Sequence, residues 1–104
     1  MSKVGFTCSC FDLFHAGHVL MLKEAKSYCN YLIVGLQIDP TIDRPQKNKP
    51  VQSVEERLIQ LEGCRYVDEV RLYTTEKQLL AMLKRLKLDV RIVGADWKRR
   101  YFTG

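Results

Sequence analysis

Both histidines of the chain, His15 and His18, lie in one short stretch, residues 11–18 (FDLFHAGH). Gly17 stands between them and lets the backbone come close to a bound group. The stretch falls where a loop turns into a helix, and the free N–H groups and partial positive charge of a helix start attract anions. Two imidazoles placed there can donate hydrogen bonds to phosphate oxygens, and transfer reactions at phosphorus depend mainly on positioning and charge stabilisation. The pattern therefore predicts a phosphate site.

A second interpretation of the same stretch uses the neighbouring thiols. Cys8, Cys10, His15 and His18 are four potential metal ligands within eleven residues, and zinc takes such donors. The usual short Cys-x2-4-Cys and His-x3-5-His spacings are not met, which makes structural zinc the weaker interpretation. A purely structural role, with one histidine capping or packing and the other incidental, is also open.

The elements that must position these residues alternate along the chain. Ser53 with Glu56, and Thr75 with Gln78, have the spacing of capping boxes and mark two helix starts. Apolar periodicity predicts a further helix over residues 18–28. Four strands are expected at residues 3–7, 31–37, 67–72 and 89–94. The alternation predicts an α/β fold, a Rossmann-like parallel sheet of about four strands with helices on both faces.

In open parallel sheets, ligands bind beyond the carboxyl ends of the strands. The loop with the two histidines follows the first expected strand, Asp39 follows the second, and Asp96 and Trp97 follow the fourth. We therefore expect these polar residues to gather at one edge of the sheet.

Several stretches carry a family resemblance. Residues 15–18 (HAGH) are similar to the HxGH signature of the cytidylyltransferase-like nucleotidyltransferases, and residues 9–12 (SCFD) stand where that family usually has G-T-F-D. Residues 65–69 (RYVDE) look like the R-Y-V-D-E element of glycerol-3-phosphate cytidylyltransferases, and residues 94–97 (GADW) resemble their G-x-D-W segment. With these elements in order at fitting spacing, the chain most resembles the glycerol-3-phosphate cytidylyltransferases.

The resemblance implies an enzyme that moves a cytidylyl group from CTP to a small phosphorylated alcohol, such as glycerol 3-phosphate, and releases pyrophosphate. It implies Mg²⁺ or another divalent cation, with Asp12 either assisting the ion or orienting the site. His15 and His18 would stabilise charge on the transferring phosphate, and Arg65 is a further catalytic candidate. The nucleotide contacts would come from Cys10, Phe11, His15, Ala16, Gly17, His18, Asp96 and Trp97.

Phosphate contacts are expected from basic residues elsewhere in the chain. Lys47 and Lys49 lie in the loop where the resembled family places phosphate-gripping lysines, although solvated loop charges are the alternative. Lys77 stands at a helix start and is a weaker candidate. Arg57 and Arg65 fall within partly apolar segments, where an arginine requires an anionic partner.

The base and the completeness of the site leave alternatives open. The carboxylate of Asp96 would favour the amine of cytosine over the carbonyl of uracil, while Trp97 could stack on the base or close the core. Cys10, however, also occurs at this place in related heptose-phosphate adenylyltransferases, so ATP is the alternative. The chain stops at Gly104, and the R-T-E-G-I-S-[ST]-T segment of the resembled family has no counterpart here, so a non-catalytic or truncated module is the third interpretation.

Composition limits the class of protein. The 104 residues are 46% hydrophobic, enough for one domain with one core, and the net charge of +5 suits an anionic partner. There is no signal-peptide pattern and no membrane-length apolar run, so we expect a cytoplasmic protein with free thiols. The short basic run at residues 98–100 does not indicate a nucleic-acid partner. Apolar Tyr66 and Val67 beside complementary charges predict a homodimer.

Overall fold

A computed structural model describes residues 3–92 and 101–103, with side chains described in the first range. Eight elements follow one another along the chain: β1 (Val4–Ser9), α1 (Ala16–Lys26), β2 (Tyr31–Gln37), α2 (Val54–Glu62), β3 (Glu69–Tyr73), α3 (Glu76–Arg85), β4 (Val90–Ile92) and β5 (Tyr101–Thr103). The strands form one sheet in the order β3-β2-β1-β4-β5. β1 to β4 are parallel, and β5 pairs antiparallel with β4. The predicted Rossmann-like fold is confirmed.

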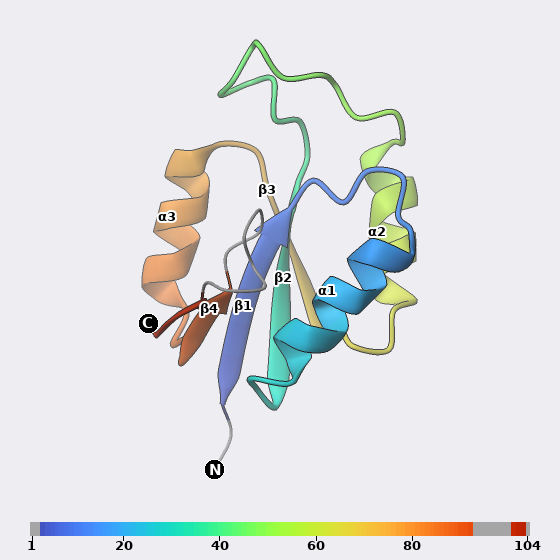
Figure 1. Ribbon diagram of the computed structural model, residues 1–104. Coiled ribbons are helices and arrows are strands. Elements are labelled where there is room, and N and C mark those ends of the chain that lie inside the picture. The colour runs from blue at the N-terminus through green and yellow to red at the C-terminus, as the bar shows by residue number, and fades with distance from the viewer. Residues whose placement is uncertain (1–2, 93–100, 104) are drawn as a thin grey trace.

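The sheet lies between two layers of helices, with α1 and α2 on one face and α3 on the other (Figure 1). Alternate residues of β2 supply the two cores, as a strand covered on both faces requires. Leu32, Val34 and Leu36 pack with α1 and α2, whereas Ile33 packs with Phe6 on the α3 side. These four side chains of β2, Leu32, Ile33, Val34 and Leu36, are all buried, which explains the apolar run of this strand.

Two element boundaries differ from the sequence prediction in ways that matter. α1 begins at Ala16, two residues before the predicted start, because His15 itself caps the helix. β5 was not predicted, since three residues give too little alternation to identify a strand. Its antiparallel pairing with β4 adds a strand to the expected parallel sheet.

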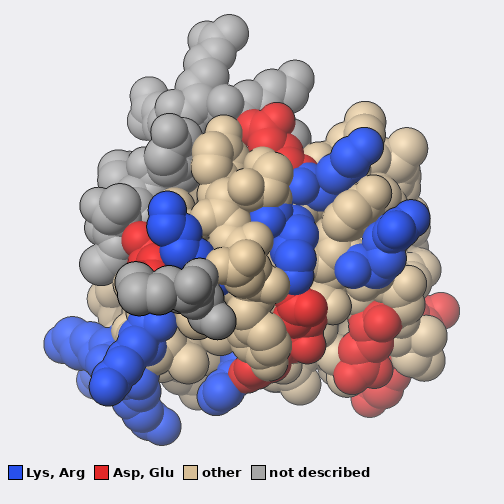
Figure 2. Space-filling view, turned by 90° about the horizontal axis from the view of Figure 1, so that it is seen from below, with Lys and Arg blue, Asp and Glu red and all other residues tan. Residues whose placement is uncertain are grey.

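The chain order sets a topological switch point between β1 and β4. β2 and β3 lie on one side of β1, and their connections run through α1 and α2; β4 lies on the other side and is reached through α3. Ligands of doubly wound sheets bind at the carboxyl ends of strands beside such a point. The opposite, amino edge of the sheet shows basic and acidic side chains on the same face (Figure 2). No helix in the described part of the chain is both long and apolar enough to span a bilayer.

Candidate active site

The two histidines cap α1 and also hold each other in place. Nδ1 of His15 accepts a hydrogen bond from the Gly17 N–H at 2.9 Å, and Nδ1 of His18 accepts one from the His15 N–H at 3.1 Å. Together they form a capping box in which imidazoles replace the usual hydroxyl and carboxylate. The ring centroids lie 4.1 Å apart. The helix start at the end of β1 is thus built from the residues predicted to carry the chemistry.

These contacts determine which ring nitrogen carries the proton. A nitrogen that accepts a hydrogen bond has no proton, so each neutral ring is protonated on Nε2. Each histidine therefore retains one N–H donor that the cap does not use. His18 stacks on Phe14 with centroids 5.4 Å apart and lies against Phe11 at 5.6 Å. Its burial, together with the charge of His15, lowers the pKa of His18 and favours this neutral form.

Gly17 is needed because of the ring of His15. A Cβ at position 17 would stand 2.7 Å from Cε1 of His15, closer than real Cβ atoms come, and a tight 3.0 Å from Nδ1, so the ring would have to shift. We expected Gly17 to admit a bound group; the described contacts show that it first admits the imidazole that caps the helix.

Asp12 connects the two loops at the carboxyl edge. Its two carboxylate oxygens accept hydrogen bonds from the backbone N–H groups of Val51 and Gln52, at 2.8 and 2.9 Å. The bond from Gln52, followed by that from Val51, lowers the pKa of Asp12. In return, the Gln52 side chain accepts a hydrogen bond from the Leu13 N–H at 2.8 Å. Gln52 was not among the predicted site residues, and no local pattern relates residues so far apart in sequence.

Arg57 is buried, with 2% of its surface exposed, and its guanidinium faces backbone carbonyls. It was predicted as a phosphate contact, but its hydrogen bonds lie within the protein. They run to the carbonyl oxygens of Cys10, Gln37, Ile38, Gln52 and Ser53, at 2.7–3.3 Å. The anionic partner expected for this arginine is therefore replaced by a set of carbonyl dipoles, and these contacts give no support to a phosphate role.

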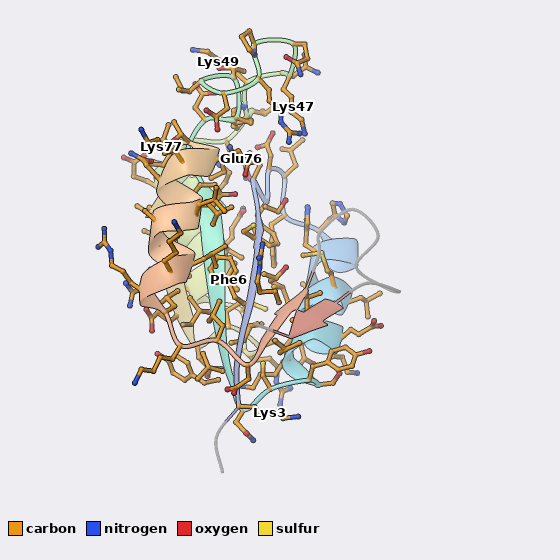
Figure 3. The ribbon with its side chains drawn as sticks, turned by 90° about the vertical axis from the view of Figure 1, so that its left-hand side faces the viewer. Lys3, Phe6, Lys47, Lys49, Glu76 and Lys77 are labelled. Carbon is orange, nitrogen blue, oxygen red and sulfur yellow. The ribbon has the colours of Figure 1, made fainter. Side chains whose placement is uncertain are left out.

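The three predicted phosphate lysines lie at the carboxyl end of the sheet, far from Lys3 at the other end (Figure 3). Lys47 and Lys49 belong to the loop between β2 and α2, and Lys77 is in the first turn of α3. Lys49 is paired with Asp39 at 3.8 Å but remains 76% exposed, whereas Lys47 forms no ion pair with any described residue. The loop is joined to α3 by Asp43, which accepts a hydrogen bond from the Glu76 N–H.

Arg65 is the main correction to the predicted site. It lies between α2 and β3, at the amino edge of the sheet, where its guanidinium stands 5.7 Å from the ring centre of Tyr66. Within one chain it is therefore at the opposite edge from the two histidines. The connection from a helix back to a parallel strand always reaches that edge, so a catalytic contact from Arg65 in the same chain does not fit the topology. Asp96 and Trp97 lie outside the described residues.

The predicted nucleotide contacts in the first loop serve the fold as well. Phe11 is buried in the core, with 1% of its surface exposed, and Phe11 and Leu13 both have positive φ, 51° and 52°. Such a backbone is costly for residues with a side chain, and it persists only where neighbouring contacts determine it. The cysteine at position 10 is half-buried and supplies a carbonyl to Arg57. Ala16 opens α1 and is exposed.

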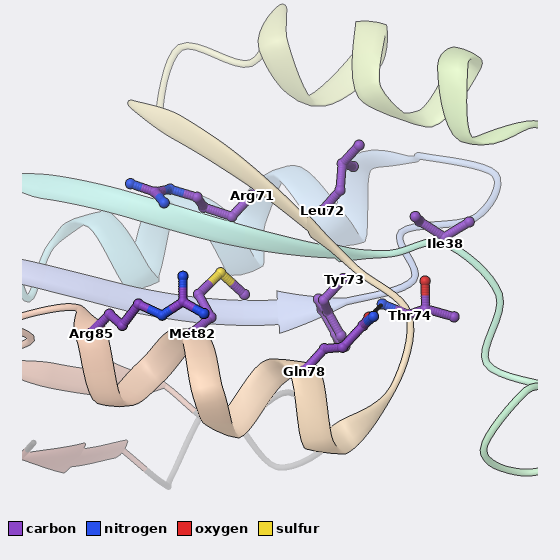
Figure 4. A pocket seen from close by; sticks show the side chains of 8 residues that line it. All are labelled: Ile38, Arg71, Leu72, Tyr73, Thr74, Gln78, Met82 and Arg85. Carbon is purple, nitrogen blue, oxygen red and sulfur yellow. Dashed lines mark hydrogen bonds between the residues drawn. The ribbon is translucent and has the colours of Figure 1, made fainter.

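The donor set does not fit a metal held by the protein alone. Within residues 3–92, His, Cys, Asp and Glu side chains form no group of three that could hold an ion, so the zinc interpretation gains no support. Both oxygens of Asp12 already accept backbone hydrogen bonds. A cavity of about 400 Å³ lies elsewhere, between β3 and α3, and is lined by Arg71, Tyr73, Gln78 and Arg85 among others (Figure 4). It contains neither histidine.

Comparison with known proteins identifies the family. The family model described as Cytidylyltransferase-like matches residues 6–101. The chain belongs to the cytidylyltransferase-like family. This confirms the resemblance drawn from the HAGH stretch and places the chain among the nucleotidyltransferases.

Relatives in the cytidylyltransferase-like family bear different names. The bifunctional protein HldE of Caulobacter vibrioides is 42% identical over 91% of this chain and 20% of its own length. A probable ethanolamine-phosphate cytidylyltransferase of Encephalitozoon cuniculi is 48% identical over 65% of the chain and 21% of its own length. The chain thus spans about a fifth of the length of these curated relatives. The lipopolysaccharide core biosynthesis protein of Thermoplasma volcanium has a similar structure, with TM-score 0.80 and 26% identity over 96% of this chain and 80% of that one.

Proposed function

We propose that this chain transfers a nucleotidyl group to a small phosphorylated alcohol. A phosphate oxygen of the acceptor attacks the α-phosphorus of a nucleoside triphosphate, the bond between the α-phosphorus and its bridging oxygen breaks, and pyrophosphate leaves. The observation that carries the proposal is the pair of capping histidines: their Nδ1 atoms hold the helix start, and their Nε2–H groups are left as donors beside the switch point. Preorganised donors stabilise charge that develops on a transferring phosphate.

CTP is our first candidate for the nucleotide. Asp96 follows β4 in the chain, and a carboxylate there would accept a hydrogen bond from the amine of cytosine. ATP is the second candidate, because residues 10–12 (CFD) resemble the corresponding stretch of heptose-phosphate adenylyltransferases. The relative named as a cytidylyltransferase matches 65% of the chain, and the HldE protein matches 91%, so family membership leaves the base open.

The remaining parts of the proposal concern partners. Mg²⁺ or another divalent ion would arrive with the triphosphate, because magnesium is commonly held by substrate phosphates and few protein groups. Lys47, Lys49 and Lys77 would contact the phosphates of the nucleotide and the acceptor. A homodimer through residues 65–69 would use the parts of Tyr66 and Val67 that stay exposed, since both side chains are partly buried against the core.

The test is pyrophosphate release, measured with CTP, ATP, UTP and GTP in turn. Each nucleotide is paired with glycerol 3-phosphate, phosphocholine, phosphoethanolamine or a heptose phosphate, in the presence of Mg²⁺. The proposal expects release with one nucleotide well above the others, by the roughly 5- to 150-fold that about 1–3 kcal/mol of base discrimination gives. A wild-type rate no higher than that of His15→Asn with every pair would overturn the assignment.

A further inference from the structure

The loop between β2 and α2 is held at both of its ends by one side chain. This segment, residues 38–52, is called the lysine loop because it carries Lys47 and Lys49. Arg57 donates from Nη1 and Nη2 to the carbonyls of Gln37 and Ile38, where the loop begins, at 2.7 Å each. Its Nε donates at 3.2 Å to the carbonyl of Gln52, where the loop ends.

The same guanidinium also reaches the loop after β1. Residues 10–15 form this histidine loop, and Arg57 Nη1 donates to the Cys10 carbonyl at 3.0 Å. Asp12 and Gln52 also join the two loops. Asp12, in the histidine loop, accepts hydrogen bonds from the N–H groups of Val51 and Gln52, and the Gln52 side chain accepts one from the Leu13 N–H. The start of the histidine loop and both ends of the lysine loop therefore meet around a single buried arginine, while residues 42–49 between those ends are exposed.

We propose that Arg57 and Asp12 are positioning residues that set the lysine loop against the histidine loop, so that phosphates gripped by the lysines lie within reach of the imidazoles. This inference rests on the proposed function for its catalytic consequence, although not for the loop geometry itself. The planar fork of an arginine suits it for this task, because its donors point in fixed and different directions. A lysine keeps the charge but has all its donors on one atom. It therefore cannot bond at once to the start of the histidine loop and to both ends of the lysine loop.

The direct test compares Arg57→Lys with the wild type by hydrogen exchange of the protein without nucleotide. The amides of Leu13, Val51 and Gln52 should exchange about tenfold faster or more, as expected for local opening, while those of β2 keep their protection. Arg85→Lys is the matched control, because Arg85 is exposed in the last turn of α3 and forms no ion pair within the described residues. Unchanged exchange at the three amides, or faster exchange throughout the sheet, would overturn the positioning role.

Turnover supplies the second readout. In Arg57→Lys we expect kcat to fall on the order of 100-fold, the size of effect that a misplacement of about 1 Å can cause, and KM for the nucleotide to rise, at temperatures where the variant is fully folded. A residue that only stabilises the fold would leave both constants unchanged under those conditions, and that result would also contradict the proposal.

Asp12→Asn tests the same connection if Arg57→Lys does not fold. The amide offers one acceptor atom where the carboxylate offers two, so exchange should accelerate at Val51 or Gln52, and normal exchange at both would refute the proposal. These measurements need no substrate. A wild-type protein that releases no pyrophosphate would therefore contradict the proposed function alone and leave the loop geometry to be decided by exchange.

Discussion

The histidine loop and the lysine loop, neighbours at the carboxyl edge, differ in how firmly they hold the side chains that we assign to the site. The histidine loop directs the imidazole of His15 and the carboxylate of Asp12 to backbone N–H groups, and buries Phe11 almost completely. In the lysine loop, residues 42–49 are all exposed, and among the described residues its basic side chains form surface ion pairs at 3.6 and 3.8 Å. Groups that stabilise developing charge gain most from being fixed before the substrate arrives. Groups that hold distal phosphates can adjust to them, so the first loop should control kcat and the second KM.

The largest effect is expected from variants that remove the Nε2 donors and keep the helix cap. Asparagine is among the best N-cap residues, so His15→Asn can retain the cap at the N-cap position. His18 is the third helical residue, and in His18→Asn the amide oxygen takes the place of Nδ1 as the acceptor for the His15 N–H; both variants lose the imidazole. We expect kcat to fall on the order of 10²–10³-fold in each, the usual effect of losing one such donor, with little change in melting temperature. Steady-state kinetics and thermal unfolding decide it: a loss of activity that only follows a loss of folded protein would favour the structural role.

Gly17→Ala should also lower activity without lowering stability, by displacing the His15 ring and not removing it. Alanine inside a helix is favoured over glycine by about 0.5–1 kcal/mol, but its Cβ would stand 2.7 Å from the His15 ring. The ring must move, so we expect roughly 10- to 100-fold lower kcat in a protein that unfolds at about the wild-type temperature. Wild-type turnover would show that the position of the His15 ring is unimportant.

Lys47→Ala and Lys49→Ala should have their effect on binding. Each lysine that donates a charge-assisted hydrogen bond to a phosphate contributes roughly 1.5 kcal/mol or more, so its removal should raise the nucleotide KM about tenfold. Stability should not change, because Lys49 is 76% exposed and its bridge to Asp39 is a surface ion pair. If kcat falls and KM does not, the lysine loop takes part in the charge stabilisation that we assign to the histidines.

The smallest expected effect is a pH dependence of stability that comes from His18. Its pKa is lowered in the folded protein, mainly by burial and next by the charge of His15, while Asp12 opposes the shift. The unfolded chain therefore binds a proton first as the pH falls below about 6.5. Stability should accordingly decline as the pH falls from that value through the folded pKa, and be unaffected by His18 above it. Melting temperatures from pH 8 to pH 5 should decline less in His18→Asn; parallel declines would contradict the assignment.

Local hydrogen bonds made parts of this molecule predictable from sequence. The capping boxes at Ser53 and Thr75 join residues three apart, and both are present as expected. The contacts that sequence did not give join distant residues: Arg57 meets Cys10 across 47 positions, and Asp12 meets Gln52, the site residue that was not predicted, across 40. Arg65 was a catalytic candidate by its resemblance to a motif, and such a resemblance does not state at which edge of the sheet the motif lies. The alternation of helices and strands already contained that information.

In the proposed mechanism, both imidazoles are fixed as Nε2–H donors by their own helix cap and meet the phosphates of the nucleotide. Nitrogen-15 NMR of histidine-labelled protein at pH 8 measures this directly, because the two ring nitrogens differ in shift and coupling according to which carries the proton. We expect unprotonated Nδ1 and protonated Nε2 in both His15 and His18, with the Nε2 signals shifting when the nucleotide and Mg²⁺ are added. An Nδ1–H tautomer in either ring, or Nε2 signals that do not respond to a nucleotide that binds, would contradict it.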